Sequence, residues 1–151
     1  NKPHFHPNFL PKILIFSTFI PSLNSLTIME HIIEILKSGG TILYPTDTIW
    51  GIGCDATNIE AVNKIFDIKK REKNKSMIIL VESEKRLQDL VDVPEMAWEI
   101  IDLSEKPVTI VYENPRGLPK ELLAEDGSIG IRLVKNDFCI VQWFYIITPN
   151  F

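Results

Sequence analysis

Residues 45–53, with the sequence PTDTIWGIG, combine side chains that can bind a polar or anionic ligand. Two threonine hydroxyls and a carboxylate precede two glycines, and glycines let a ligand approach the backbone closely. An ordinary turn, in which Thr46 and Asp47 bond neighbouring amides, explains the same residue types. Because the segment matches neither a Walker motif nor a dinucleotide-binding fingerprint, it indicates a binding loop only together with other evidence.

A second candidate is the basic run at residues 69–76, KKREKNKS, which carries five positive charges and one negative charge. It leads into an apolar segment that begins at Met77, and α/β folds bind ligands in loops at strand ends. Arg71 can hold a phosphate through two parallel N–H bonds, while lysines act as point charges, so the run suits a triphosphate. The alternative is a solvated helix end whose lysines face the negative end of the helix dipole.

The third candidate is Arg132, which lies in the otherwise apolar segment at residues 128–134. A buried arginine is costly without an anionic partner, so Arg132 either faces a ligand or pairs with a carboxylate such as Asp126 or Asp137. Thr109 is a polar residue in a second apolar segment, where an ordinary strand threonine is the simpler interpretation.

Composition limits the classes of protein that can hold these residues. The chain has 151 residues, of which 45% are hydrophobic and 24% charged, which indicates one globular domain. The net charge of −4 excludes a nucleic-acid binder that relies on its overall field, so a polyanion site must be a local cluster. Cys54 and Cys139 match no zinc or redox spacing and are expected to be reduced thiols. No segment reaches the roughly 20 apolar residues of a membrane span.

The elements that position these residues alternate between helices and strands. We expect helices over residues 30–37, 59–70 and 84–90, another from Pro94, and one or two helical turns within 118–124. Strands are expected over residues 41–44, 77–81, 107–112 and 128–134. This order predicts an α/β layered domain whose loops gather at strand ends.

Local signals support the boundaries of these elements. Gly39 and Gly40 should end the first helix with a positive φ, and Asn58 and Ser83 should cap the next two helices. Pro107 opens a strand at a position where no ladder hydrogen bond is lost. The residues expected on inner helix faces are Ala61, Val62, Ile65, Phe66, Leu87, Ala97, Ile100 and Ile101.

The two ends of the chain differ in texture from its middle. Met29 resembles a natural initiator, so we expect residues 1–28 to be an extension and residues 29–138 to form the domain. Residues 139–151 form an uncharged tail that is rich in aromatic side chains, and a strand over residues 140–147 is one interpretation of it. Such a segment would be an aggregation hazard if exposed, so we expect it to be buried or atypical of a native ending.

Taken together, the motifs resemble the YrdC-like threonylcarbamoyl-AMP synthase family. The matching segments are YPTDT at 44–48, WGIGCDA at 50–56, IFDIKKREKNKS at 65–76, PVTIV at 107–111 and GIR at 130–132. The family has tyrosine at the position of Trp50 and proline at that of Ser76. The resemblance covers about residues 29–138 and implies a YrdC-like twisted mixed sheet with flanking helices and a concave basic cavity. Family members continue into a Ser-x-x-Asn-type loop that completes the nucleotide pocket, so we expect this domain to be incomplete.

The resemblance implies synthesis of L-threonylcarbamoyladenylate and pyrophosphate from L-threonine, bicarbonate and ATP. It places Thr48 on L-threonine and gives catalytic roles to Lys69 and Arg71. The residues that it implies for ATP binding are Lys69, Arg71, Lys75, Thr109 and Arg132. Mg²⁺ would accompany ATP, and no protein metal site is expected. The implied setting is the cytoplasm, without a membrane, and the implied partners are tRNA and the threonylcarbamoyl transferase machinery.

Three alternatives remain beside a synthase. The same fold could hold nucleotide or RNA without turnover, as a binding module, or the chain could be an inactive fragment. A carbamoyl-transfer domain of the kind found in hydrogenase-maturation proteins is a third, although those proteins are much longer and carry further motif-bearing regions. Release of pyrophosphate that depends on threonine would distinguish the synthase from the binding module.

Overall fold

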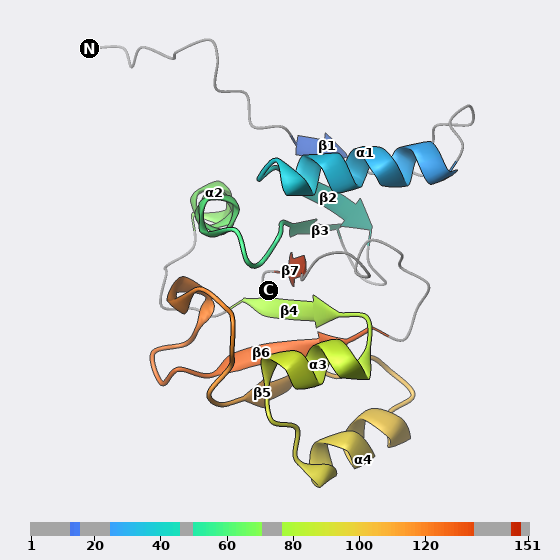
Figure 1. Ribbon diagram of the computed structural model, residues 1–151, viewed down its shortest axis with the longest axis vertical. Coiled ribbons are helices and arrows are strands. Elements are labelled where there is room, and N and C mark those ends of the chain that lie inside the picture. Colours follow the sequence, from blue (N-terminus) through green and yellow to red (C-terminus); the bar gives the residue numbers. More distant parts are fainter. Residues whose placement is uncertain (1–12, 16–24, 46–49, 71–76, 135–145, 149–151) are drawn as a thin grey trace.

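The computed structural model describes residues 13–15, 25–45, 50–70, 77–134 and 146–148. Its strands form two mixed sheets, and helices lie against both of them (Figure 1). The three-stranded sheet has the order β1 (Ile13–Ile15), β2 (Thr41–Pro45) and β3 (Trp50–Gly53). The four-stranded sheet has the order β5 (Ile110–Tyr112), β6 (Ile129–Leu133), β4 (Ile78–Val81) and β7 (Ile146–Thr148). The predicted α/β class is confirmed.

Strand β3 differs from the irregular loop that the threonine- and glycine-rich segment suggests. It pairs antiparallel with β2, and Tyr44 lies opposite Gly51 in the register. A Cβ atom on Gly51 would come within 2.8 Å of Tyr44 Cζ, so the tyrosine ring occupies the space that a side chain would need. Gly51 therefore has a packing role inside the sheet.

Helix α1 (Ser25–Lys37) begins earlier than the predicted start at Glu30. It ends as predicted, because Gly39 adopts a φ of 71°, which a residue with a side chain rarely adopts. The backbone N–H groups of Gly39 and Gly40 then donate to the carbonyls of Leu36 and Ile35, at 3.0 and 2.8 Å. These bonds satisfy carbonyls of the last helical turn and direct the chain into β2.

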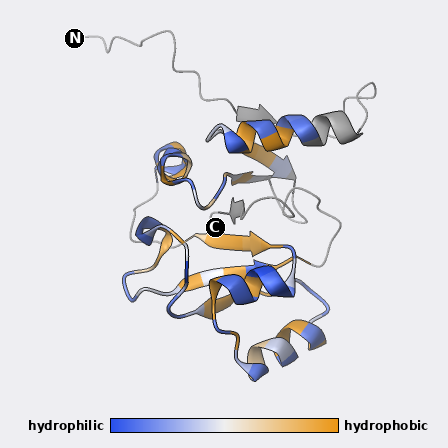
Figure 2. Ribbon diagram, viewed as in Figure 1, coloured by the Kyte–Doolittle hydropathy of each residue, from blue (hydrophilic) through white to orange (hydrophobic). Residues whose placement is uncertain are grey.

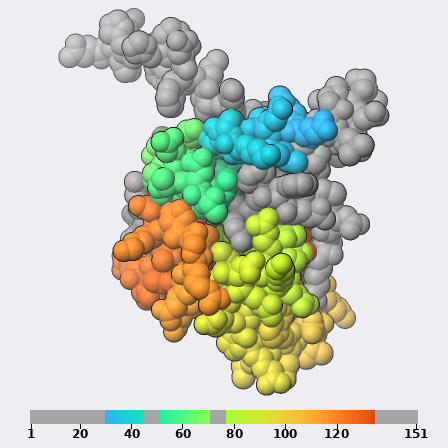
Figure 3. Space-filling view, viewed as in Figure 1, coloured from blue at the N-terminus to red at the C-terminus, as the bar shows by residue number. Residues whose placement is uncertain are grey.

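Helix α2 (Ile59–Lys69) follows the predicted cap and the predicted face. Asn58 Oδ1 accepts from the backbone N–H groups of Glu60 and Ala61, both at 3.1 Å. The helix ends where Lys70 takes a left-handed conformation with a φ of 49°. Its buried residues are those expected from the sequence: Ala61, Val62, Ile65 and Phe66. In the space-filling view (Figure 3) the green surface of α2 adjoins the orange surface of the segment before β6, and both supply the same core.

The four-stranded sheet is built around the parallel pair β4–β6, with β5 antiparallel to β6. Ladder pairs of β5 run only from Ile110 to Tyr112, so residues 107–109 precede the strand instead of opening it as predicted. Pro107 has no N–H group to give to a ladder. Apolar side chains of β4 and β6 join one core with α2. The ribbon of β4 is orange in Figure 2, which marks its residues as hydrophobic.

Two further helices and one short turn complete the structure. Helix α3 (Glu84–Leu90) is capped by Ser83 as predicted, and its inward residue Leu87 is buried. Helix α4 (Glu95–Leu103) buries Ala97 and Ile101, as its sequence indicates. The expectation for Ile100 is wrong, because its side chain is 44% exposed: it lies toward the outer side of a helix that has only one covered face. A single 3₁₀ turn, η1 (Lys120–Leu122), lies within the predicted segment.

Both end regions contribute a strand. Strand β1, from the expected extension, pairs in parallel with β2, and β7, from the apolar tail, pairs antiparallel with β4. The other residues of the predicted strand, 140–145, lie outside the described residues. Within the described part of the chain, no helix has the length and apolar character needed to cross a membrane.

Candidate anion-binding site on the four-stranded sheet

Arg132 and Thr109 form the polar pair of the four-stranded sheet. The ladder places Ile110 opposite Ile131, so the residue before β5 lies beside the next residue of β6. Arg132 Nε donates a hydrogen bond of 3.0 Å to Thr109 Oγ1, and the pair is partly buried. The structure thus brings together two candidate residues that are 23 positions apart in the sequence.

Arg132 does not pair with Asp126, which is one of the two carboxylates that the sequence offered as the alternative to a ligand. Asp126 Oδ1 instead accepts from the backbone N–H of Ser128, at 2.9 Å, within the turn that leads into β6. An aspartate commonly bonds the backbone two residues ahead, and this local bond accounts for the Asp126 carboxylate. Asp137, the other predicted partner, lies outside the described residues. Among the described residues, no ion pair joins Arg132 to an acidic side chain.

The absence of a side chain on Gly130 fits the Arg132–Thr109 pair. A Cβ atom at position 130 would lie 3.3 Å from Thr109 Cγ2, which is closer than ordinary van der Waals contact allows. The threonine methyl group therefore fills the space that a larger residue at position 130 would need. Gly130 lets Thr109 lie close to β6, where its hydroxyl can reach Arg132.

Tyr44 shows that the field of Arg132 reaches the three-stranded sheet. Its side chain is 2% exposed, and burial raises the pKa of the phenol above its ordinary value. The positive charge of Arg132 acts in the opposite direction and lowers that pKa, which requires the guanidinium to lie near the phenol. The guanidinium of Arg132 therefore lies within electrostatic range of the Tyr44 phenol.

Of the remaining candidate residues, the structure describes Lys69. Lys69 is exposed at the C-terminal end of α2, directly before the left-handed turn at Lys70. Thr48, Arg71 and Lys75 lie outside the described residues, so their roles remain predictions.

Cys54 has no feature of a nucleophile. It is a free, fully buried cysteine, and its Sγ donates weakly to the carbonyl of Asp55 at 3.6 Å. Burial raises the pKa of the thiol, so it stays protonated at neutral pH, and the thiolate is the reactive form. Cys139, the other predicted thiol, lies outside the described residues. In the part of the chain that the structure describes, no three His, Cys, Asp or Glu side chains are grouped to hold a metal.

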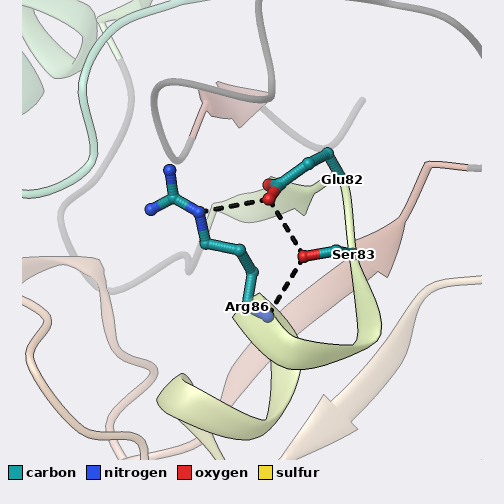
Figure 4. Close-up of polar contacts among 3 residues, drawn as sticks. All are labelled: Glu82, Ser83 and Arg86. Carbon is teal, nitrogen blue, oxygen red and sulfur yellow. Dashed lines mark hydrogen bonds and ion pairs between the residues drawn. The ribbon is translucent and has the colours of Figure 1, made fainter.

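The sequence did not single out Glu82, which joins the end of β4 to α3 (Figure 4). Its Oε1 atom accepts from Ser83 Oγ at 2.9 Å and from Arg86 Nε at 3.2 Å, while Ser83 Oγ accepts from the backbone N–H of Arg86. A glutamate four residues before an arginine was the signal that could have indicated this pair. The network holds the cap of α3 and fixes the direction in which the chain leaves β4.

The fold is an α/β domain with two mixed sheets and flanking helices. Its four-stranded sheet carries Arg132, which is hydrogen-bonded to Thr109. The chain belongs to the Sua5/YciO/YrdC family, whose description reads "Telomere recombination" and whose model matches residues 34–141. The solved structure of Sua5 from P. abyssi complexed with L-threonine has the same fold, with a TM-score of 0.77 at 20% identity. That likeness covers 91% of this chain and 41% of the P. abyssi chain.

Curated relatives with a named activity are also similar in sequence. The threonylcarbamoyl-AMP synthase of Aliivibrio fischeri is 32% identical over 109 residues, which cover 70% of this chain and 59% of the relative. The threonylcarbamoyl-AMP synthase of Moraxella catarrhalis is 38% identical over 65 residues, which cover 43% of this chain and 32% of the relative. This chain therefore spans less than two thirds of the length of either relative.

Proposed function

We propose that this chain acts as a threonylcarbamoyl-AMP synthase, which forms L-threonylcarbamoyladenylate and pyrophosphate from L-threonine, bicarbonate and ATP. The observation that carries the proposal is the similarity, over 109 residues, to a synthase of that name. The fold shared with a Sua5 protein complexed with L-threonine supports threonine as the amino-acid substrate.

The proposed reaction needs positioning and charge neutralisation more than it needs a protein nucleophile. The threonine amine takes up CO2 from bicarbonate to give a carbamate, and the amine proton leaves with the hydroxide of bicarbonate as water. A carbamate oxygen then attacks the α-phosphorus of ATP, and the bond from that phosphorus to the bridging oxygen breaks as pyrophosphate leaves. Negative charge accumulates on the phosphates, and fixed cations stabilise it. Arg132 is a permanent cation and can stabilise this charge. The buried Cys54 thiol is protonated, which agrees with a reaction that needs no protein nucleophile.

We assign the residues accordingly. Lys69 and Arg71 neutralise the reacting phosphates, Lys75 contributes a further cation, and Thr48 contacts L-threonine. Arg132, with Thr109, binds an anionic group on the four-stranded sheet. Mg²⁺ enters with the triphosphate as part of the substrate, because this ion is held mainly by phosphates and water and needs few protein carboxylates.

The proposed product also defines the partners. An activated threonylcarbamoyl group is consumed by a transferase that modifies an adenosine of tRNA, so the partners are tRNA and that transferase machinery. ATP and tRNA are both cytoplasmic, and we place the reaction in the cytoplasm on that ground.

A pyrophosphate assay on the full chain tests the proposal. ATP and bicarbonate are supplied with and without L-threonine, and threonine-dependent release is the expected result. ATP or RNA binding without release would contradict the synthase and favour the binding module. Arg71→Ala should abolish most of the release, while Lys85→Ala, on the exposed side of α3, is the matched control that keeps it. Full activity of Arg71→Ala would contradict the phosphate role of Arg71.

A further inference from the structure

The hydrogen bond to Thr109 uses one end of the Arg132 guanidinium, and the other end has no hydrogen-bond partner among the described residues. A guanidinium has five N–H donors in a planar fork, and Arg132 gives its single Nε–H to Thr109 Oγ1. The four remaining N–H groups lie on the two terminal nitrogens. This edge matches two oxygens of a phosphate or a carboxylate.

The chemistry of Thr109 makes it suitable as a fixed support. A hydroxyl oxygen accepts a hydrogen bond without carrying a negative charge, so it orients the guanidinium without neutralising it. An aspartate at the same place would have formed an ion pair and lowered the attraction for a second anion.

Gly130 limits where Thr109 can lie. Its missing side chain leaves room for the Thr109 methyl group, at 3.3 Å from where a Cβ would be, and Ile78 Cγ1 closes the same space at 3.7 Å. An alanine at position 130 would push Thr109 away from β6 by a few tenths of an ångström. A hydrogen bond depends steeply on distance and angle, so this shift would loosen the hold on Arg132.

We propose that Thr109 and Gly130 are positioning residues that act through Arg132. They fix the Nε end of the guanidinium so that its terminal edge meets a bidentate anionic group of the substrate. That group is either a phosphate of ATP or the carboxylate of L-threonine, and this identity rests on the proposed function. The loss of affinity caused by changing Thr109 should then depend on the presence of Arg132.

Binding measurements on the full chain test the dependence on Arg132. Thr109→Val keeps the shape and removes the acceptor, and should weaken binding of one ligand about tenfold, while Thr109→Ser should stay within about twofold. Gly130→Ala should weaken it about threefold, and Arg132→Lys, which loses the fork, about a hundredfold. Separate titrations with ATP and with L-threonine identify which ligand provides the anion.

The double variant decides between support and independent contact. If Thr109 acts through Arg132, Thr109→Val/Arg132→Lys should bind within about twofold of Arg132→Lys alone. Additive losses would overturn the proposal. Thr57→Val is the matched control, because it removes a threonine hydroxyl that bonds only Asp55, at 2.7 Å, and it should leave both affinities unchanged.

A ligand-free measurement separates this inference from the synthase activity. The Nε–H proton of Arg132 should exchange slowly with water in the wild-type chain and in Thr109→Ser, and rapidly in Thr109→Val, as followed by nuclear magnetic resonance. Equal exchange in all three would overturn the proposal, as would lost protection with no change in either affinity. Missing pyrophosphate release, with ligand binding and coupling intact, would contradict the synthase alone.

Discussion

Two arginines in the same half of the molecule serve opposite purposes. Arg116 lies in the segment between β5 and η1 and donates its hydrogen bonds to other residues of the protein. Its Nη1 bonds Asp92 Oδ1 at 2.8 Å, its Nη2 bonds the carbonyl of Gln88 at 2.6 Å, and its Nε reaches the carbonyl of Asp89 at 3.4 Å. Arg132, on β6, gives Nε to a neutral hydroxyl and makes no ion pair with an acidic residue among those described.

The environment of each guanidinium explains the difference. The last carbonyls of α3 have no partner within the helix, and they attract a cation at the negative end of the helix dipole. Arg116 meets this need, and its backbone N–H also donates to the carbonyl of Leu90, at 2.7 Å. In the described part of the chain, no helix end supplies carbonyls to Arg132, which extends from a strand between two other strands. The number of protein acceptors around an arginine therefore distinguishes a structural arginine from one available to a ligand.

The largest expected effect is on ligand binding when Arg132 is changed. Arg132→Gln keeps a polar side chain but removes both the charge and the fork, so the affinity for ATP or L-threonine should fall by more than about a hundredfold, or more than about 2.7 kcal/mol. The thermal unfolding midpoint should move by less than about 2 °C, because few protein contacts are lost. Titration calorimetry and a thermal melt measure both. A large loss of stability with unchanged ligand affinity would show that Arg132 has a structural role and does not bind the ligand.

Arg116→Gln is the matched variant and should show the opposite pattern. It removes three hydrogen bonds that tie the segment after β5 to the end of α3. Bonds from a charged donor are worth more than neutral ones, but the side chain is 51% exposed, so water screens it. We expect a loss of about 1.5 kcal/mol in unfolding free energy, which is a fall of about 3–6 °C in the melting midpoint. Ligand affinity of the folded protein should not change, and a tenfold loss of affinity would contradict the structural role.

A smaller effect is expected when only the acidic partner of Arg116 is removed. The Asp92 side chain is 96% exposed, and exposed ion pairs contribute little. Asp92→Ala should therefore lower the melting midpoint by less than about 2 °C, and 1 M salt should change this difference only slightly. A fall as large as that of Arg116→Gln would show that the ion pair, and not the helix carbonyls, holds the segment.

Most of the secondary structure could be predicted, because its signals are local. Asn58 as a cap and the buried face of α2 depend on residues within a few positions of each other, and both are confirmed. Strand β3 was missed, because its glycine is required by the ring of Tyr44 on the neighbouring strand, and no local pattern records that contact. The prediction that β5 begins at Pro107 was also wrong. A strand extends only where its residues pair with a neighbouring strand, and the pairs of β5 begin at Ile110.

The candidate site could be predicted by residue type but not by pairing. The cost of burying a charge singled out Arg132, and the same reasoning suggested a carboxylate as its partner. The structure supplies Thr109 instead, through a ladder that brings distant residues together. The need for Gly130 depends on the same ladder and on the methyl group of Thr109. Because such pairings depend on strand register, spacing along the chain could not reveal them.

The smallest expected effect concerns Asp126, one of two carboxylates considered as a partner of Arg132, and it is lost in acid. The hydroxyl and backbone N–H of Ser128 both donate to its carboxylate, and these bonds lower the pKa of Asp126 in the folded chain. A lowered folded pKa adds stability above the unfolded value of about 3.9, and that stability is lost as the pH falls through the folded pKa. Asp126→Ala should therefore be less stable than the wild type by a constant amount above about pH 5, and this difference in unfolding free energy should narrow below about pH 4.

Urea unfolding between pH 3 and 7 measures the difference in unfolding free energy. Ser128→Ala, which keeps the backbone donor, should have a stability between those of Asp126→Ala and the wild type. A gap that persists unchanged at pH 3 would exclude the carboxylate charge as its source. Ligand affinity at pH 7 should match the wild type, because β4 and β5 hold Arg132 in place from either side.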